Sequence, residues 1–187
     1  MKMILKRRLF LLFIMGAVIG SVLDSFHVYG GAAYYAKPMA LGISLWTPLI
    51  LGIATVVIGF THCLIHPVIW KLKPAVITSV ILFIIAYWVS AFYAGSNMEK
   101  AIIILLLYLL GWGLYDRTWE SLILATVTAL IGSAVEGILG FVGFFIYTRP
   151  DYLYIPIWLL PLYANASAAC GNLGRYFLSK KVMIVNV

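Results

Sequence analysis

The sequence has few charged residues and almost no cysteine. Only 10% of its 187 residues are charged and 64% are hydrophobic, with six acidic residues against 13 basic ones. A soluble domain carries about 25% charged residues, so this chain lacks the polar side chains to cover a surface in water. The two cysteines lie within apolar segments, which excludes a disulfide-stapled secreted module. These absences indicate a membrane protein without a large soluble domain.

Motifs of catalysis and of ion conduction are also missing. The sequence contains no H-E-x-x-H, no G-x-S-x-G, no phosphate-binding glycine loop, no paired carboxylates and no series of charges within its apolar segments. The composition therefore predicts binding rather than chemistry, with no cofactor and no metal. A net charge of +7 would suggest nucleic acid in a soluble protein, but here the basic residues cluster at segment ends. That pattern indicates membrane anchoring and no nucleic-acid partner.

Long apolar segments dominate what is present. A helix needs about 20 apolar residues to cross the bilayer core. Basic residues precede the first apolar segment, as in a signal peptide, but no convincing small-residue cleavage site follows, so we expect a retained helix. The prediction is an all-α bundle of six transmembrane helices in a single domain, residues 1–187, and therefore a multi-pass integral membrane protein. The six segments are 9–28, 45–66, 75–95, 101–115, 121–146 and 156–178.

The distribution of Lys and Arg predicts the orientation. With the N-terminus in the cytoplasm, ten basic residues fall on the cytoplasmic side, and three, Lys37, Lys100 and Arg149, fall on the other. Cytoplasmic loops of membrane proteins carry an excess of Lys and Arg. We therefore expect both termini to be cytoplasmic.

Each charge within an apolar segment costs about 2.5–3.5 kcal/mol on insertion scales. Glu136 lies near the middle of the fifth segment, beside Ser133 and Gly137. It either bonds to a neighbouring helix or faces a cavity and contacts the head of a bound lipid. Asp24 lies near the outer end of the first segment, with His27 one turn on, and we expect it to snorkel to the interface or to cap a helix.

Two histidines, His62 and His66, are spaced i and i+4 near the inner end of the second segment. This spacing is compatible with a metal site. No acidic residue is near them in the sequence, and His66 precedes a proline at a helix end. We therefore expect two histidines at the membrane interface.

Glycines recur at helical spacing. Gly16 and Gly20 form a G-x-x-x-G, which is typical of close helix contacts. In a six-helix chain we expect packing within the bundle, although a homo-oligomer stays an open alternative. Gly137, Gly140 and Gly143 weaken the fifth segment and permit bending around a ligand.

Three motifs in the C-terminal half are more specific. They are W-G-L-Y-D-R at 112–117, Y-T-R-P-D-Y-L-Y at 147–154 and C-G-N-L-G-R at 170–175. The sequence resembles the Insig (insulin-induced gene) family. Its members carry an aromatic-Asp-Arg after the fourth helix, Y-T-x-P-D-[FY]-L-Y before the sixth helix and G-N-[IL]-G-R at its end. The first half agrees more loosely, through W-x-P at 46–48 and the glycine pattern at 52–59.

The resemblance implies six transmembrane helices, both termini in the cytoplasm and a role in lipid regulation. Animal Insigs reside in the endoplasmic reticulum, bind oxysterols, retain the SREBP cleavage-activating protein Scap and support degradation of HMG-CoA reductase. The Asp that matches Asp116 is associated with the Scap interaction, which makes this region a candidate site for a membrane-protein partner. The short tails and loops and the acidic Glu136 resemble a prokaryotic relative, which would reside in the plasma membrane.

Local chemistry predicts further roles for the motif residues. Asp116 and Arg117 would cap a helix end or form an Asp–Arg network at the fourth-to-fifth turn, or else form a docking surface. Asn172 and Arg175 would lie near lipid phosphates or near Asp116, and we predict a contact between Asp116 and Arg175. Tyr147 would belong to an outer aromatic belt.

The preferred function is that of a non-enzymatic lipid-binding protein, acting as a sensor or regulator. We expect a sterol or diacylglycerol-like lipid in a cavity between the helices, its oxygens meeting Glu136, Ser133 or Asn165, with Asp24 as a further candidate. An alternative is a substrate-capturing membrane subunit of a vitamin importer, which also has six helices but needs polar outer loops. A third is a membrane enzyme acting on lipid, with the two histidines and Glu136 as its only candidates. A solidly packed interior would contradict the lipid-binding hypothesis.

Overall fold

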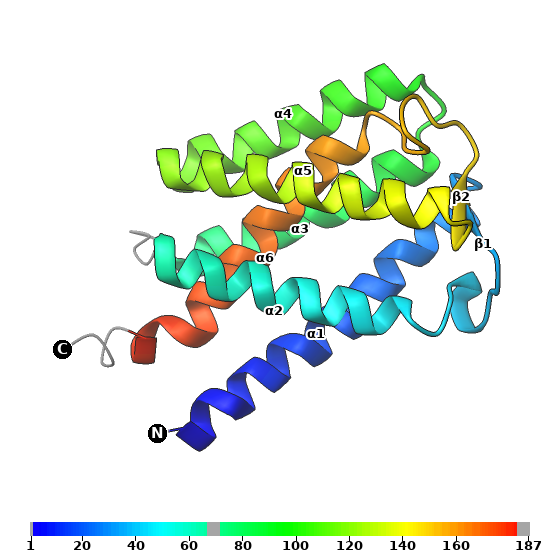
Figure 1. Cartoon of the computed structure of the whole chain (residues 1–187). Helices are drawn as coiled ribbons and strands as arrows, with labels where there is room; N and C mark the ends of the chain where they lie inside the picture. Colours follow the sequence, from blue (N-terminus) through cyan, green and yellow to red (C-terminus); the bar gives the residue numbers. More distant parts are fainter. Residues whose placement is uncertain (1, 67–71, 183–187) are drawn as a thin grey trace.

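The computed structural model describes residues 2–66 and 72–182, and its architecture is a bundle of six helices (Figure 1). This confirms the predicted all-α fold. The helices are α1 (Lys2–Tyr29), α2 (Thr47–Ile65), α3 (Leu72–Phe92), α4 (Asn97–Tyr115), α5 (Trp119–Phe141) and α6 (Leu159–Val182).

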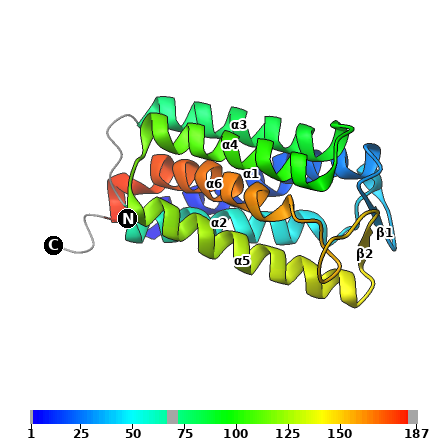
Figure 2. The same ribbon diagram turned by 90° about the horizontal axis from the view of Figure 1, so that it is seen from above.

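Five of these helices, α1 to α5, are long and apolar enough to cross a membrane, with mean hydropathy between 1.6 and 2.3. The sixth, α6, is more polar because it carries Asn165, Asn172 and Arg175. It lies in the middle of the bundle and contacts all five other helices (Figure 2). Protein rather than lipid therefore surrounds α6, and its polar side chains can find partners there.

A small sheet closes one end of the bundle. Strands β1 (Ala33–Tyr35) and β2 (Phe145–Tyr147) pair antiparallel and link the α1–α2 connection to the α5–α6 connection. A short 3-10 turn, η1 (Ala40–Gly42), follows β1. The fifth predicted segment ran to residue 146, but α5 ends at Phe141. Gly143 adopts a left-handed backbone conformation (φ 79°), and the chain is extended beyond it.

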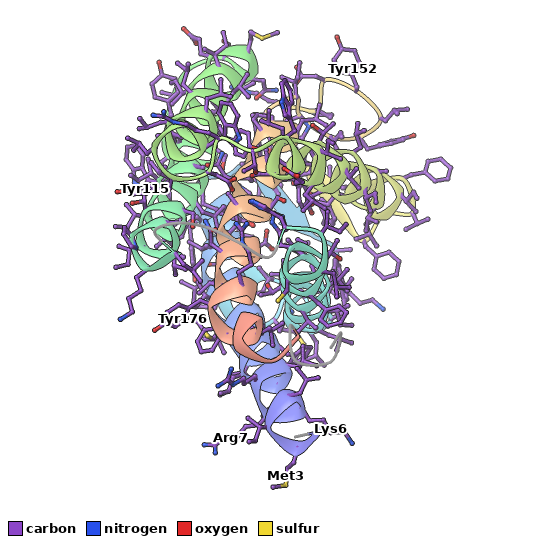
Figure 3. All side chains as sticks on the ribbon, turned by 90° about the vertical axis from the view of Figure 1, so that its left-hand side faces the viewer. Met3, Lys6, Arg7, Tyr115, Tyr152 and Tyr176 are labelled. Atoms are coloured by element: carbon purple, nitrogen blue, oxygen red, sulfur yellow. The ribbon has the colours of Figure 1, made fainter. Side chains whose placement is uncertain are left out.

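The other end of the bundle carries the start of α1 and the end of α6 (Figure 1). Lys6 and Arg7 are exposed there and project away from the helices (Figure 3). The two ends of the molecule thus differ in character, one basic and one closed by the sheet.

Glycines set the closest helix contacts. A Cβ on Gly20 would lie 3.1 Å from the Leu51 Cβ of α2, so the G-x-x-x-G packs within the bundle, as predicted. A Cβ on Gly59 of α2 would lie 3.0 Å from the Gly174 Cα of α6. Backbone meets backbone at this crossing, which is typical of small residues in membrane helix pairs.

Candidate functional site

Two carboxylates that are far apart in the sequence line one cavity near the sheet. Asp24 of α1 and Glu136 of α5 border a space of about 50 Å³ between α1, α2, α3, α5, α6 and both strands. Asp24 was predicted near the outer end of the first apolar segment, and Glu136 near the middle of the fifth. The structure therefore brings two of the four predicted lipid-binding residues together.

Tyrosine hydroxyls hold both carboxylates in place. Tyr147 and Tyr163 each donate a hydrogen bond to one carboxylate oxygen of Glu136, and Tyr35 donates to Asp24. Burial, reinforced by the neighbouring carboxylates, raises the pKa of Tyr35 and Tyr147 far above its usual value. The phenols therefore stay protonated and act as donors.

The sheet positions two of these tyrosines. Successive residues of a strand point to opposite faces, and here Ala33, Phe145 and Tyr147 face inward, whereas Tyr34 faces outward. Tyr147 is only 5% exposed, so its predicted place in an outer aromatic belt is wrong. The pairing of β1 with β2 turns it towards the Glu136 carboxylate instead.

Asp24 is also linked to a buried histidine. His27 Nδ1 lies 3.6 Å from Asp24 Oδ1, and the Asp24 side chain is 17% exposed. The Ser90 hydroxyl donates to Tyr87 O (2.8 Å), so it accepts from His27 Nε2, which also lies at 2.8 Å. The prediction that Asp24 snorkels to the interface is therefore wrong, because the Tyr35 hydroxyl inside the bundle donates to its carboxylate.

An apolar cavity adjoins the polar one. It measures about 100 Å³, lies between α1, α2, α3 and α6, and shares Leu51, Tyr87 and Tyr163 with the Asp24–Glu136 cavity. Gly16 and Gly20 form part of its wall. Together the two spaces offer polar groups at one end and an apolar interior at the other, which is the pattern that an amphiphile requires.

The other two predicted lipid-binding residues lie elsewhere. Asn165 donates through Nδ2 to Ile104 O (3.0 Å) and to Pro161 O (2.9 Å), and so joins α6 to α4. Ser133 is buried on α5, and its hydroxyl has no hydrogen-bond partner among the described residues. Neither residue lines the Asp24–Glu136 cavity.

A second polar cluster lies near the basic end of the bundle. Arg175 of α6 is 1% exposed, and its Nη2 lies 3.6 Å from Asp116 Oδ2 and 2.5 Å from Asn172 Oδ1. The predicted contact between Asp116 and Arg175 is therefore present. Arg175 Nη1 also bonds to the ring and carbonyl of His66, and Thr118 Oγ1 donates to Asp116 Oδ1 (2.6 Å).

This cluster corrects two predictions. Arg175 and Asn172 are buried, so they do not lie among lipid phosphates. His62 and His66 are buried rather than interfacial, because Ser167 and Arg175 of α6 offer them polar partners inside the bundle. No group of three metal-ligating side chains occurs within residues 2–66 and 72–182.

Arg117 is not the partner of Asp116. It is exposed, and its Nε donates to Gly113 O (2.5 Å), where it satisfies a carbonyl at the end of α4. Sequence adjacency suggested an Asp116–Arg117 network, but the ion pair forms with α6. Of the two structural roles predicted for this turn, the helix-end cap rather than the Asp116–Arg117 network is the one that Arg117 performs.

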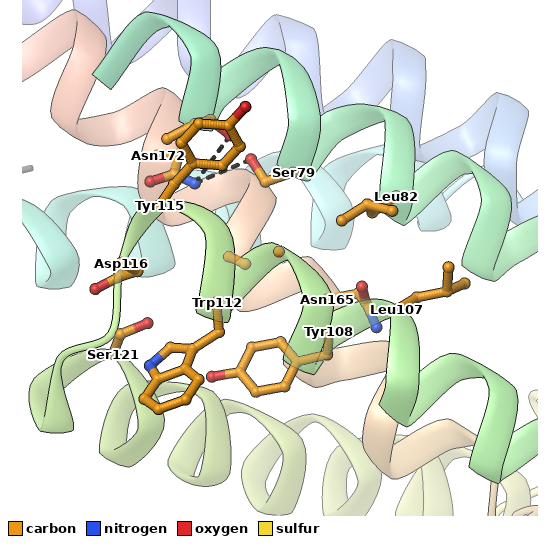
Figure 4. A pocket seen from close by; sticks show the side chains of 13 residues that line it. Ser79, Leu82, Leu107, Tyr108, Trp112, Tyr115, Asp116, Ser121, Asn165 and Asn172 are labelled. Carbon is orange, nitrogen blue, oxygen red and sulfur yellow. Dashed lines mark hydrogen bonds between the residues drawn. The ribbon is translucent and has the colours of Figure 1, made fainter. Parts of the chain in front are cut away.

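The Asp116 cluster borders a water-sized cavity between α3, α4, α5 and α6 (Figure 4). Its volume is about 20 Å³, enough for one water molecule. Asn172 Nδ2 donates to Ser79 Oγ (3.0 Å) at one side of it, and Trp112 and Tyr108 lie at another (Figure 4). The space is too small for a lipid and indicates a structural role.

A larger groove of about 500 Å³ runs between α4 and α5 over α6. Its walls are almost entirely apolar, and none of the residues that line it is charged. Lipid chains are as apolar as these walls, so they can fill the groove without selectivity. It therefore lacks the polar groups that would distinguish one lipid from another. The lining residues include Leu105, Leu109, Ala125, Ala129, Leu130 and Leu160.

The fold and these buried groups define a multi-pass integral membrane protein that holds polar side chains inside its helix bundle. The sequence is 27% identical over 179 residues to the insulin-induced gene 1 protein of Danio rerio, covering 90% of this chain and 71% of that protein. The human insulin-induced gene 1 protein is 26% identical over 181 residues, covering 91% of this chain and 65% of that protein. The Xenopus laevis insulin-induced gene 2 protein is 26% identical over 184 residues, covering 93% of this chain and 84% of that protein. The resemblance to the Insig family is thereby confirmed.

The fold matches that of a mycobacterial Insig homologue. The crystal structure of MvINS from Mycobacterium vanbaalenii superimposes with a TM-score of 0.82, covering 94% of this chain and 96% of that one at 21% identity. A cross-linked trimer of MvINS gives a TM-score of 0.83 with the same coverage. No family model matches the sequence.

Proposed function

We propose that this protein is a non-enzymatic, Insig-like membrane protein that binds a sterol or a diacylglycerol-like lipid inside its helix bundle. The lipid hydroxyl occupies the Asp24–Glu136 cavity, and the apolar body enters the adjoining cavity between α1, α2, α3 and α6. The observation that carries the proposal is the junction of these cavities at Leu51, Tyr87 and Tyr163.

The chemistry of the polar cavity suits a hydroxyl group. A lipid hydroxyl can donate to a carboxylate oxygen of Glu136 or Asp24 and accept from a tyrosine that now donates to them. Burying a polar group without a hydrogen bond costs free energy, so a lipid that places no oxygen in the Asp24–Glu136 cavity is disfavoured.

Binding also requires movement. Ligand sites for molecules of this size are about 300–1,000 Å³, whereas the polar and apolar cavities measure about 50 and 100 Å³. The lining side chains must therefore rearrange as the lipid enters. The lipid-bound protein would then have larger internal cavities than the empty protein. A lipid sensor needs two such distinct conformations.

The proposal is tested by lipid analysis of the gently purified protein. We expect one class of neutral lipid to be enriched in the wild type and to fall at least about tenfold in Glu136→Leu, which leaves the Tyr147 and Tyr163 hydroxyls without their carboxylate. Glu120→Gln, at an exposed acid on the same helix, is the matched control and should retain the lipid. No enriched lipid in the wild type, or equal occupancy in Glu136→Leu, would contradict the proposal.

Association with other membrane proteins is part of the proposed role. MvINS forms a cross-linked trimer, and we propose a homo-oligomer for this chain, to be measured by native mass spectrometry. A membrane-protein partner near Asp116 would contact the exposed Arg117 and Trp119 around it, because Asp116 itself is only 10% exposed.

The substrate-capturing subunit of a vitamin importer is the alternative function. The similarity to proteins named as Insigs favours lipid binding over it. Vitamin uptake by cells that produce the protein would overturn this preference.

A further inference from the structure

A third cavity, separate from the lipid site, opens at the sheet end of the bundle. It measures about 340 Å³ and lies where α1 and α3 end, α4 begins and the chain leaves β2. Unlike the groove between α4 and α5, it is lined largely by polar atoms. Tyr147 and Trp158 form its inner wall, and Tyr147 separates it from the Asp24–Glu136 cavity.

Positive charge converges on this cavity. Lys100 and Arg149 line it, although they come from α4 and from the segment after β2. They are two of the three basic residues expected on this side of the membrane. None of the residues that line the cavity, all in the described part of the chain, is acidic.

The acidic residues nearby are engaged elsewhere. Glu99 accepts from the Ser96 backbone N–H (2.7 Å) and completes the capping box of α4. Asp151 Oδ2 accepts from Asn97 Nδ2 (2.9 Å) and from the backbone N–H of Ile157 (2.8 Å). No carboxylate within residues 2–66 and 72–182 lies within salt-bridge distance of either cation.

Lys100 retains binding capacity. Its Nζ donates one hydrogen bond, to Ser90 O at 2.8 Å, and an ammonium group has three hydrogens. The half-buried position of Lys100 limits its solvation, whereas Arg149 is exposed and can close over an occupant. Two like charges that share a cavity repel each other, and an anion between them removes that repulsion.

We propose that this cavity binds a phosphate anion, with Lys100 and Arg149 as its ligands. The source is either the headgroup of an anionic phospholipid or free inorganic phosphate. The position at the end of the helices is the depth of lipid headgroups, and an exposed aromatic ring such as that of Tyr93 is typical of that depth. The volume admits a phosphate with an attached glycerol.

The test compares three neutralised variants, Lys100→Gln, Arg149→Gln and Lys37→Gln. Lys37 is exposed at the same end of the molecule but does not line the cavity, so its variant is the matched control. The proteins are placed in nanodiscs of phosphatidylcholine with or without phosphatidylglycerol, and bound lipid is measured by native mass spectrometry. A second arm titrates inorganic phosphate in phosphatidylcholine nanodiscs and follows thermal unfolding.

Phosphatidylglycerol should bind equally to the wild type and to Lys37→Gln. It should bind about tenfold more weakly to Lys100→Gln and to Arg149→Gln, because each of these variants loses a charge-assisted hydrogen bond. Stabilisation by inorganic phosphate alone, lost in the same two variants, would identify free phosphate as the occupant. Should Lys100→Gln fail to fold, Arg149→Gln decides, since its side chain is exposed. The proposal would be overturned if the wild type, Arg149→Gln and Lys37→Gln bound phosphatidylglycerol equally and inorganic phosphate also stabilised them equally. The neutral lipid at Glu136 is counted separately in each spectrum, so the two sites succeed or fail independently.

Discussion

Arg175 is the most demanding residue of this protein, because a cation inside a membrane bundle requires a complete set of partners. Asp116, His66 and Asn172 supply partners for both Nη atoms from the turn after α4, the end of α2 and α6, whereas the buried Nε has no hydrogen-bond partner among the described residues. Breaking a buried ion pair by removing one partner leaves an uncompensated charge. The cluster therefore fixes the basic end of the bundle.

Replacing Asp116 tests this role. Asp116→Ala should lower the free energy of unfolding by about 3 kcal/mol, because the Arg175 guanidinium loses its carboxylate. Reversible denaturation in detergent micelles measures the change. Arg117→Ala, at the exposed neighbouring residue, should change stability by less than about 0.5 kcal/mol. Unfolding of Asp116→Ala at the wild-type denaturant concentration would contradict the structural role.

The sequence identified the acids of both polar clusters but not all of their partners. Glu136 and Asp116 stand out because charge is so rare in the chain. Tyr163 and Ser90 carry no such signal, since tyrosine and serine occur throughout membrane helices. The proximity of His27 to Asp24 could be predicted, because His27 lies three residues after Asp24 and therefore on the same helix face.

Among the helices, α6 determines how the others are arranged. It is the least apolar of the six, yet it contacts all the others. Its apolar length predicted a membrane segment, but hydropathy does not say which helix is central. The partners of its polar side chains could be seen only in the folded bundle. Strand β2 was missed because Phe145–Tyr147 is as apolar as the helix before it.

The crossing of α2 and α6 depends on the absence of side chains. In Gly59→Val, the new Cβ would lie 3.0 Å from Gly174 Cα and 3.1 Å from Cys170 O, and overpacking of this kind costs about 1–3 kcal/mol. Thermal unfolding of the purified protein measures the loss.

Gly113→Ala is the control for this prediction. A Cβ at Gly113 would meet nothing within 4 Å, so this variant should be as stable as the wild type or slightly more stable. Equal melting of Gly59→Val and the wild type would show that the crossing tolerates a wider helix separation.

For the whole molecule, the orientation in the membrane follows from charge. Arg175 was counted among the ten basic residues on the cytoplasmic side, but it is buried. Without it, nine basic residues lie on that side and three on the other. We expect the basic end with the start of α1 to face the cytoplasm.

Cysteine labelling checks this orientation. In a Cys63→Ala, Cys170→Ala background, Lys37→Cys should react with a membrane-impermeant maleimide on intact cells. Lys6→Cys should react only after the cells are permeabilised. Both positions are exposed, so burial does not limit either reaction. The reverse pattern would show that the termini lie outside.

The central claim is that the interior between α1, α2, α3 and α6, rather than the groove between α4 and α5, holds a selected lipid. Photo-crosslinking with a diacylglycerol analogue that carries a diazirine in its acyl chain, followed by mass spectrometric mapping, measures this directly. We predict labels at Leu51, Phe83 and Ala166, which line the interior cavity, and their loss in Glu136→Leu. Labels confined to Leu105, Ala125 and Leu130 of the groove, unchanged in that variant, would contradict the account.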